Sequence, residues 1–240
     1  MKTVNDVNYS QSTEEKLLNI YLPECTDFDT VVFFHGGGLV EGTRNNNDLI
    51  LPIVNKGVAV VSVEYRMLPK VHFPDFLYDA AESVAYVQKN IKSIGGNGKI
   101  FVNGDSAGAY ITMMLCLDDK YYKAFGVDKD SISGYISNSA QQFAHFNLLT
   151  DRGFDGRIER IDETAPISFV KAGLEIKPLY IICYTNDMPC RPEENRLMYK
   201  SMKRFLPETS VLEFAELAGG HCDPVDKEDY INRVYEFIKR

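Results

Sequence analysis

The sequence predicts an α/β fold in which helices cover both faces of a doubly wound, mostly parallel sheet. Short apolar runs alternate with longer amphipathic segments along nearly the whole chain. Several of these runs are continuous in Val, Ile and Phe, which is typical of strands that are covered on both faces. Strand–helix–strand alternation indicates parallel pairing through right-handed crossovers.

Seven apolar runs are predicted to be the strands. They are residues 17–22, 30–34, 58–64, 99–103, 132–137, 178–184 and 210–216. Between and after them, apolar residues at helical spacing predict three helices. The first begins near Pro74-Asp75 and ends at Gly95-Gly96, the second covers 109–117, and the last covers 227–239.

The composition is that of an ordinary globular chain. Its 240 residues are 45% hydrophobic and 25% charged, enough for one sizeable core, so we expect a single domain over 1–240. The net charge of −8 and the lack of a Lys/Arg run argue against a nucleic-acid or an anionic-membrane partner. The oligomeric state does not follow from the sequence.

The cysteine pattern favours a reducing compartment. The five cysteines are odd in number and form no C-x-x-C pair, which argues against a disulfide framework or a structural zinc site. The first twenty residues lack the apolar stretch of a secretory signal, and no apolar run has the length of a membrane span. We therefore expect a cytoplasmic protein.

One segment breaks the strand–helix rhythm. Residues 141–172 are polar, contain Gly153 and Gly156, and include no clear strand. Loops of this length in compact domains are usually functional or mobile. We expect a small lid or insertion within the domain.

A glycine-rich turn at 104–108 carries the first chemical signal. The strand 99–103 runs into Gly104-Asp105-Ser106-Ala107-Gly108, and a helical segment follows. This is the G-x-S-x-G pattern in a strand–turn–helix setting, where small residues allow a tight turn that exposes the serine hydroxyl. A glycine-rich turn without chemistry is the alternative. The setting favours Ser106 as a nucleophile.

A second glycine motif follows the strand 30–34. It reads His35-Gly36-Gly37-Gly38. Consecutive glycines let backbone N–H groups approach a ligand closely, so this loop can donate hydrogen bonds to an oxyanion together with the N–H of Ala107. A merely flexible loop is the alternative. His35 itself is expected to brace the loop.

A serine nucleophile needs a base, and the chain has four histidines. His72 lies before the nucleophile and His145 lies inside the polar segment 141–172. His221 follows the last predicted strand, where the base of such a sheet belongs in the chain order serine, acid, histidine. We favour His221, with His145 as the alternative.

The acid is expected after the strand that precedes the histidine's strand. Asp187 is the first carboxylate after the run 178–184, and we favour it as the residue that orients His221. Glu193, Glu194 and Asp223 are the alternatives. The two glutamates are expected to begin a helix, and Asp223 is very close to His221 in sequence.

Other candidates are weaker. Cys190 and Cys222 lie near Asp187 and His221 in sequence, but no glycine turn surrounds either thiol. Asp105 is expected to be a structural anchor. No zinc-protease motif, dinucleotide fingerprint or phosphate loop is present, so the sequence implies neither a cofactor nor a metal.

These residues resemble the α/β-hydrolase superfamily, and within it the hormone-sensitive-lipase-like carboxylesterases, which pair an HGGG loop with a GDSAG turn. The resemblance extends from about Leu18 to the end of the chain. It implies an α/β-hydrolase fold, a triad of Ser106, Asp187 and His221, and an oxyanion hole formed by the amides of Gly37, Gly38 and Ala107. Ala109 departs from the family, which usually has another glycine there.

The small size of the expected lid is a second difference from that family. The first predicted strand begins so near the N-terminus that little room is left for that family's N-terminal cap. Any lid then comes mostly from 141–172, with Phe143, His145 and Phe146 as candidate pocket residues. A small lid favours an open cleft and either short acyl groups or an acyl group on a bulky alcohol such as a sugar.

The expected activity is hydrolysis of small-molecule carboxylic esters through an acyl-enzyme. An amide hydrolase, such as an aryl-formamidase or a small peptidase, would use the same residues. A binding protein on a hydrolase fold, without catalysis, is the alternative from another functional class.

Overall fold

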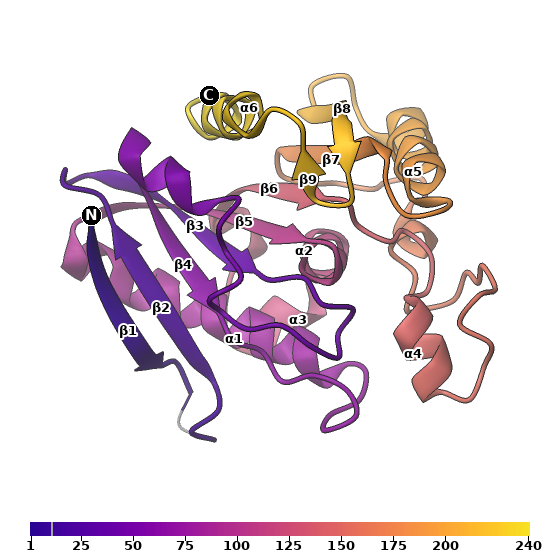
Figure 1. Cartoon of the computed structure of the whole chain (residues 1–240), viewed down its shortest axis with the longest axis horizontal. Helices are drawn as coiled ribbons and strands as arrows, with labels where there is room; N and C mark the ends of the chain where they lie inside the picture. The colour runs from indigo at the N-terminus through magenta and orange to yellow at the C-terminus, as the bar shows by residue number, and fades with distance from the viewer. Residues whose placement is uncertain (11) are drawn as a thin grey trace.

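A sheet of nine strands runs through the part of the chain that the computed structural model describes, residues 1–10 and 12–240 (Figure 1). In spatial order the strands are β1 (Lys2–Asn8), β2 (Leu17–Leu22), β4 (Val58–Val63), β3 (Phe28–Phe34), β5 (Gly96–Asp105), β6 (Ile132–Asn138), β7 (Leu179–Asn186), β8 (Leu212–Gly220) and β9 (Asp223–Pro224). The strands from β4 to β8 are parallel, whereas β1, β2 and β9 join by antiparallel pairing at the two edges. The predicted mostly parallel sheet is confirmed.

The seven predicted strands are all present, and the sequence missed two more. Strand β1 is almost entirely exposed, so it lacks the apolar run that reveals a buried strand. Strand β9 has only two residues, too few for any periodic signal. The first strand of the chain is therefore β1, and the run 17–22, which the sequence predicts as the first strand, is the second.

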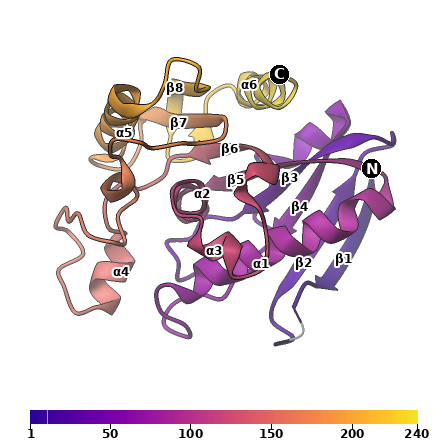
Figure 2. The same cartoon turned by 180° about the vertical axis from the view of Figure 1, so that it is seen from behind.

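Helices cover both faces of the sheet (Figure 2). On one face, α1 (Asp75–Asn90), α2 (Ala107–Leu117), α3 (Lys120–Lys123) and α5 (Arg191–Phe205) share a core cluster. On the other face, α6 (Lys227–Ile238) and the 3₁₀ turn η1 (Leu51–Lys56) share another. Alternate residues of β3 serve the two cores: Val32 and Phe34 enter the first, and Val31 and Phe33 enter the second. The doubly wound arrangement is thus built into each central strand.

The remaining short elements lie in the connections. They are the 3₁₀ turns η2 (Ile91–Ile94), η3 (Lys129–Ser131) and η4 (Pro166–Phe169), and the helix α4 (Phe146–Asp151). Segment 141–172 carries α4 and η4, contains no strand, and projects from the body of the molecule in both views (Figures 1 and 2). Its small apolar cluster consists of Ala144, Leu149 and Ala165.

Packing rather than cross-linking holds the described chain together. All five cysteines are free thiols, with Cys116 and Cys183 buried among the core residues. Among the residues that the structure describes, no helix combines the length and the apolar character that a bilayer crossing requires.

Three elements meet at the turn between β5 and α2, and glycines make the meeting possible. A Cβ atom at Gly108 would lie 1.9 Å from the carbonyl oxygen of Phe34 at the end of β3. A Cβ atom at Gly104 would lie 2.2 Å from the carbonyl carbon of Gly108. Both distances are far below van der Waals contact, so only glycine allows β3, β5 and α2 to approach this closely.

Substitution of Gly108 tests this contact. Gly108 lies in a helix without positive φ, so Gly108→Ala introduces a clash and no backbone strain. We expect it to lower the free energy of unfolding by about 3 kcal/mol, the upper range for overpacking. The control Gly126→Ala has φ 69° and open space around its new Cβ, and should cost about 1 kcal/mol from backbone strain. Urea denaturation measures both, and equal losses would contradict the steric account.

Candidate active site

Ser106 occupies the tip of the turn between β5 and α2. Its backbone has φ 54° and ψ −112°, a conformation that non-glycine residues rarely adopt and that packing must enforce. Its N–H donates to the carbonyl of Asn138 at 2.8 Å, and its carbonyl accepts from the N–H of Tyr110 at 2.9 Å. The strained backbone is thus fixed from β6 on one side and from α2 on the other.

Two hydrogen bonds connect Ser106 to His221 and Asp187. The Nδ1 atom of His221 lies 2.5 Å from Oδ1 of Asp187, and its Nε2 atom lies 2.7 Å from Oγ of Ser106. Because a carboxylate can only accept, the proton of the neutral ring sits on Nδ1. Nε2 is then free to accept the hydroxyl proton of Ser106, which is what a general base requires.

The carboxyl group of Asp187 is held as an anion although it is buried. Its side chain is 0% exposed, whereas that of His221 is 26% exposed. Burial acts to raise the pKa of Asp187, but hydrogen bonds from His221, Ser139 and the N–H of Met188 outweigh burial and lower it. A buried anion next to an imidazole stabilises the imidazolium form of the ring.

The loop after β3 and the start of α2 contain backbone amides without a partner in the described chain. Among the described residues, none accepts a hydrogen bond from the N–H of Gly37, Gly38 or Ala107. Gly37 has φ 109°, and a Cβ there would lie 1.9 Å from the carbonyl oxygen of Glu41. Gly37 therefore has to be glycine. Ala107 begins α2, where the first amides have no partner inside the helix.

His35 braces this loop, as the sequence predicted. Its ring is fully buried and stacks on Tyr65 with centroids 4.4 Å apart. Its Nδ1–H donates to the carbonyl of Gly36 at 2.7 Å, and the hydroxyl of Tyr65 donates to the carbonyl of His35 at 2.8 Å. Burial lowers the pKa of His35, so the ring is neutral and acts as a spacer.

A cavity of about 590 Å³ opens over Ser106 and His221. Its lining residues are Gly36, Gly37, Glu41, Gly42, Thr43, Asn46, Asp105, Ser106, His221 and Cys222. The lining contains two carboxylates and neither lysine nor arginine. The cleft therefore favours neutral or cationic ligands over anionic ones.

The predicted pocket residues of segment 141–172 are only partly at the site. Phe146 lines a neighbouring cavity of about 560 Å³ together with Met188, and its ring lies next to Gly38. Phe143 lines neither of these two cavities. Its N–H donates to the carboxylate of Glu194 at 3.3 Å.

The expectation that His145 contacts substrate is corrected by the structure. Its side chain is buried and stacks on Phe146 with centroids 4.4 Å apart. Its Nδ1 accepts the N–H of Asn147 at 3.3 Å, which caps the start of α4. Burial lowers the pKa of His145 to about 3. The ring is therefore a neutral packing and capping group, and it does not compete with His221 as a base.

The alternative carboxylates have other partners. Asp105 accepts from the Asn138 amide at 2.8 Å, and burial raises the pKa of Asp105 to about 6, in keeping with an anchoring role. Glu193 pairs with Arg196 at 3.2 Å, and Asp223 pairs with Lys227 at 3.4 Å. None of them contacts the ring of His221.

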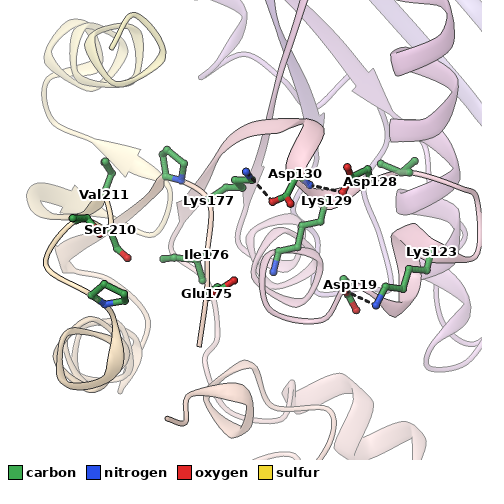
Figure 3. Close-up of a pocket in the computed structure, with 14 residues that line it drawn as sticks. Asp119, Lys123, Asp128, Lys129, Asp130, Glu175, Ile176, Lys177, Ser210 and Val211 are labelled. Atoms are coloured by element: carbon green, nitrogen blue, oxygen red, sulfur yellow. Dashed lines mark hydrogen bonds and ion pairs between the residues drawn. The ribbon is translucent and has the colours of Figure 1, made fainter. Parts of the chain in front are cut away.

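A larger cavity, of about 750 Å³, lies at the amino ends of the parallel strands (Figure 3). Its walls come from the segments just before β6, β7 and β8, whereas Ser106, Asp187 and His221 follow the ends of their strands. Two ion pairs lie in it, Asp130 with Lys177 at 2.8 Å and Lys123 with Asp119 at 2.7 Å, and its lining contains no histidine. Within the described chain, no group of three or more potential ligands is arranged to hold a metal ion.

Sequence reasoning missed the groups that support Asp187. Ser139, directly after β6, donates its hydroxyl to Oδ2 of Asp187, and buried Arg191 donates to the carbonyl of Ser139 at 2.8 Å. Neither residue belongs to a motif, because the contacts form only when β6, β7 and α5 are brought together.

Comparison with known proteins identifies the family. The family model described as BD-FAE matches residues 18–152, which is 135 of the 240 residues and more than half of the chain. The chain belongs to the BD-FAE family. The matched range contains both glycine motifs and Ser106, whereas Asp187 and His221 lie beyond it.

Curated relatives of this BD-FAE chain include esterases and a formamidase. A probable isoprenylcysteine alpha-carbonyl methylesterase from Arabidopsis thaliana is 30% identical over 135 residues, which are 55% of this chain and 31% of that protein. A kynurenine formamidase from Danio rerio is 32% identical over 121 residues, which are 49% of this chain and 40% of that protein. The chain thus spans less than half the length of these two relatives.

Solved structures similar to the BD-FAE chain extend over nearly its whole length. A truncated carbohydrate esterase from gut microbiota superimposes with a TM-score of 0.77 at 18% identity, covering 100% of this chain and 97% of that one. Esterase B from Lactobacillus rhamnosis gives 0.78 at 18% identity, covering 99% and 84%. The fold is the α/β-hydrolase fold, as the sequence predicted.

Glu194, one of the alternative acids, generates a prediction on stability. Burial raises its pKa from about 4.5 to about 7, although nearby Arg191 acts to lower it. The folded state therefore keeps a proton that the unfolded state loses, so this group costs stability as pH rises from 4.5 to 7. Glu194→Gln removes the titration and can still accept from the N–H groups of Gln142 and Phe143.

We expect the stability of the wild-type protein relative to Glu194→Gln to fall by roughly 3 kcal/mol between pH 4.5 and 7. Asp105 and His145 titrate in both proteins and cancel in the difference. Urea denaturation of the two proteins at several pH values measures it. A difference that stays constant with pH would contradict the assignment.

Proposed function

We propose that the chain hydrolyses carboxylic esters with Ser106 as nucleophile, His221 as base and Asp187 as orienting acid. The observation that carries this proposal is the unbroken hydrogen-bonded series from Asp187 through His221 to Ser106. The esterases among the curated relatives support the same activity. The paired HGGG and GDSAG motifs further suggest the hormone-sensitive-lipase-like branch of the superfamily.

The first step forms an acyl-enzyme. His221 Nε2 takes the proton of Ser106 Oγ as that oxygen attacks the ester carbonyl. The carbonyl oxygen becomes an oxyanion, which the amides of Gly37, Gly38 and Ala107 stabilise by hydrogen bonds. The imidazolium then gives its proton to the leaving alcohol as the tetrahedral intermediate collapses.

The second step releases the acid. Water loses a proton to His221 Nε2 and attacks the carbonyl of the acyl group bound to Ser106. The proton then passes from His221 to Ser106 Oγ as the bond between Oγ and the acyl carbon breaks. Throughout both steps the Asp187 carboxylate stays ionised. It keeps the proton of the neutral ring on Nδ1 and stabilises the transient positive charge.

We propose substrates with short acyl groups and no negative charge near the ester. The cleft over Ser106 has a volume of about 590 Å³, and its lining includes Glu41 but neither lysine nor arginine. Segment 141–172 is the proposed lid within a single domain over 1–240, since Asn147 donates to the carbonyl of Gly38 at 2.7 Å. The cytoplasm remains the proposed compartment, in line with five free thiols.

Formamide hydrolysis is a second candidate. The kynurenine formamidase from Danio rerio is among the relatives, and the same three residues would transfer a formyl group to Ser106 and release an amine. The two activities differ in the group that leaves, not in the residues that act.

Replacement of Ser106 tests the proposed nucleophile. Ser106→Ala should lower kcat on p-nitrophenyl acetate by a factor of about 10⁴ or more while the near-ultraviolet circular dichroism is unchanged. A fluorophosphonate probe should label the wild-type protein on Ser106 and leave Ser106→Ala unlabelled. Labelling of another serine would overturn the assignment. No labelling of the folded wild-type protein would favour a binding protein without catalysis.

The leaving group is tested with a substrate panel. We expect kcat/KM to be highest for p-nitrophenyl acetate and to fall as the acyl chain lengthens from acetyl to octanoyl, because segment 141–172 is small. N-formylkynurenine and an aminoacyl anilide are run beside the esters. A kcat/KM on N-formylkynurenine above that on every ester would make the formamidase reading the better one.

A further inference from the structure

Ser139 is fixed at every polar atom, although it lies in no motif. It follows β6 with φ 64° and is fully buried. Its N–H donates to the carbonyl of Ile182 at 2.8 Å, and its carbonyl accepts from Arg191 Nη1 at 2.8 Å. A non-glycine residue at positive φ is costly and persists only where the surroundings determine it. This backbone conformation directs the Ser139 hydroxyl toward Asp187.

That hydroxyl donates to Oδ2 of Asp187. The other carboxylate oxygen, Oδ1, accepts from His221 Nδ1 at 2.5 Å and from the N–H of Met188 at 2.7 Å. Among the described residues, Ser139 is the sole hydrogen-bond donor to Oδ2. A carboxylate bonded at Oδ1 alone can rotate about its Cβ–Cγ bond, and a donor at Oδ2 prevents this.

Arg191 extends the support into α5. Its side chain belongs to a residue that is 3% exposed, and it reaches the Ser139 carbonyl from the first position of that helix. Asn195, one turn later, donates to the carbonyl of Ala140 at 2.8 Å. Helix α5 therefore holds the turn after β6 at Ser139 and at the next residue, Ala140.

We propose that Ser139 is a positioning residue that locks the carboxylate of Asp187 in the plane in which Oδ1 faces His221. The inference rests on the proposed function, because it concerns the same three residues. Ser139 touches neither substrate nor the reacting atoms. Its effect passes through Asp187 to the ring of His221.

The hydroxyl also affects how strongly the site binds protons. A donor at Oδ2 stabilises negative charge on Asp187, and it thereby weakens the attraction of the carboxylate for a protonated His221. Without that donor the ring should hold its proton more tightly, so the acid limb of the kcat/KM profile should move to higher pH. The other titratable or charged groups around Asp187 are Cys183 and Tyr184 of β7, Arg191 of α5, Asp105 at the end of β5, and Cys222 after β8. They are the same in every variant.

Two variants remove the hydroxyl in different backbone contexts. Ser139→Ala keeps the strained φ, whereas Ser139→Gly relieves it and should fold more stably than Ser139→Ala. The matched control is Ser137→Ala on β6. Ser137 is fully buried like Ser139, but its hydroxyl has no hydrogen-bond partner in the described part of the chain.

The measurement is the pH profile of kcat and KM on p-nitrophenyl acetate. Both Ser139 variants should lose about tenfold in kcat with little change in KM, and their acid limb should move up by about half a pH unit. Ser137→Ala should stay within about twofold of the wild type with an unmoved limb.

An unmoved acid limb in both Ser139 variants would overturn the inference, whatever the loss in kcat. A shift in Ser139→Ala alone would also overturn it, because backbone strain rather than the hydroxyl would then be the cause. These failures are separate from failure of the proposed function. That function fails if the wild-type protein neither hydrolyses the ester nor reacts with the fluorophosphonate probe.

Discussion

The hydrogen bond between Ser106 Oγ and His221 Nε2 joins side chains that are 115 residues apart, and the fold around it is organised to make it. The parallel strands β5, β7 and β8 end at one edge of the sheet, so the residues that follow them lie close together. This is the edge at which open α/β sheets bind their ligands. Each residue of the series comes from a different strand end, and the stiffness of the sheet fixes their separations.

The strained backbone of two serines and the burial of Asp187 both help to fix the groups around this bond. Ser106 and Ser139 both adopt positive φ, and each donates its N–H to a carbonyl of a neighbouring strand. The buried Asp187 carboxylate remains ionised because hydrogen-bond donors of the protein lower its pKa. Such a site needs little reorganisation when charge moves from the serine to the imidazole, and preorganisation of this kind is the main source of electrostatic catalysis.

The sequence predicted the central strands and the three residues of the hydrogen-bonded series, because both have strong local signals. Apolar runs reveal strands that are buried on both faces, and the glycine turn around Ser106 leaves few positions for its partners. It missed β1, whose exposed residues carry no such run. It also misjudged His145, because nothing local separates a buried capping histidine from one that faces a cleft. Ser139 could not be found, since a lone serine after a strand gains meaning only from the tertiary contact with Asp187.

If the bond between Ser106 and His221 makes this serine a nucleophile, an ester substrate should leave its acyl group on it. The most direct measurement mixes the protein with p-nitrophenyl acetate, quenches with acid during the first turnovers, and determines the intact mass and the peptide masses. The account predicts the added mass of one acetyl group on the peptide that contains Ser106. Release of p-nitrophenol by the wild-type protein with no acetylated Ser106 at any quench time would contradict it.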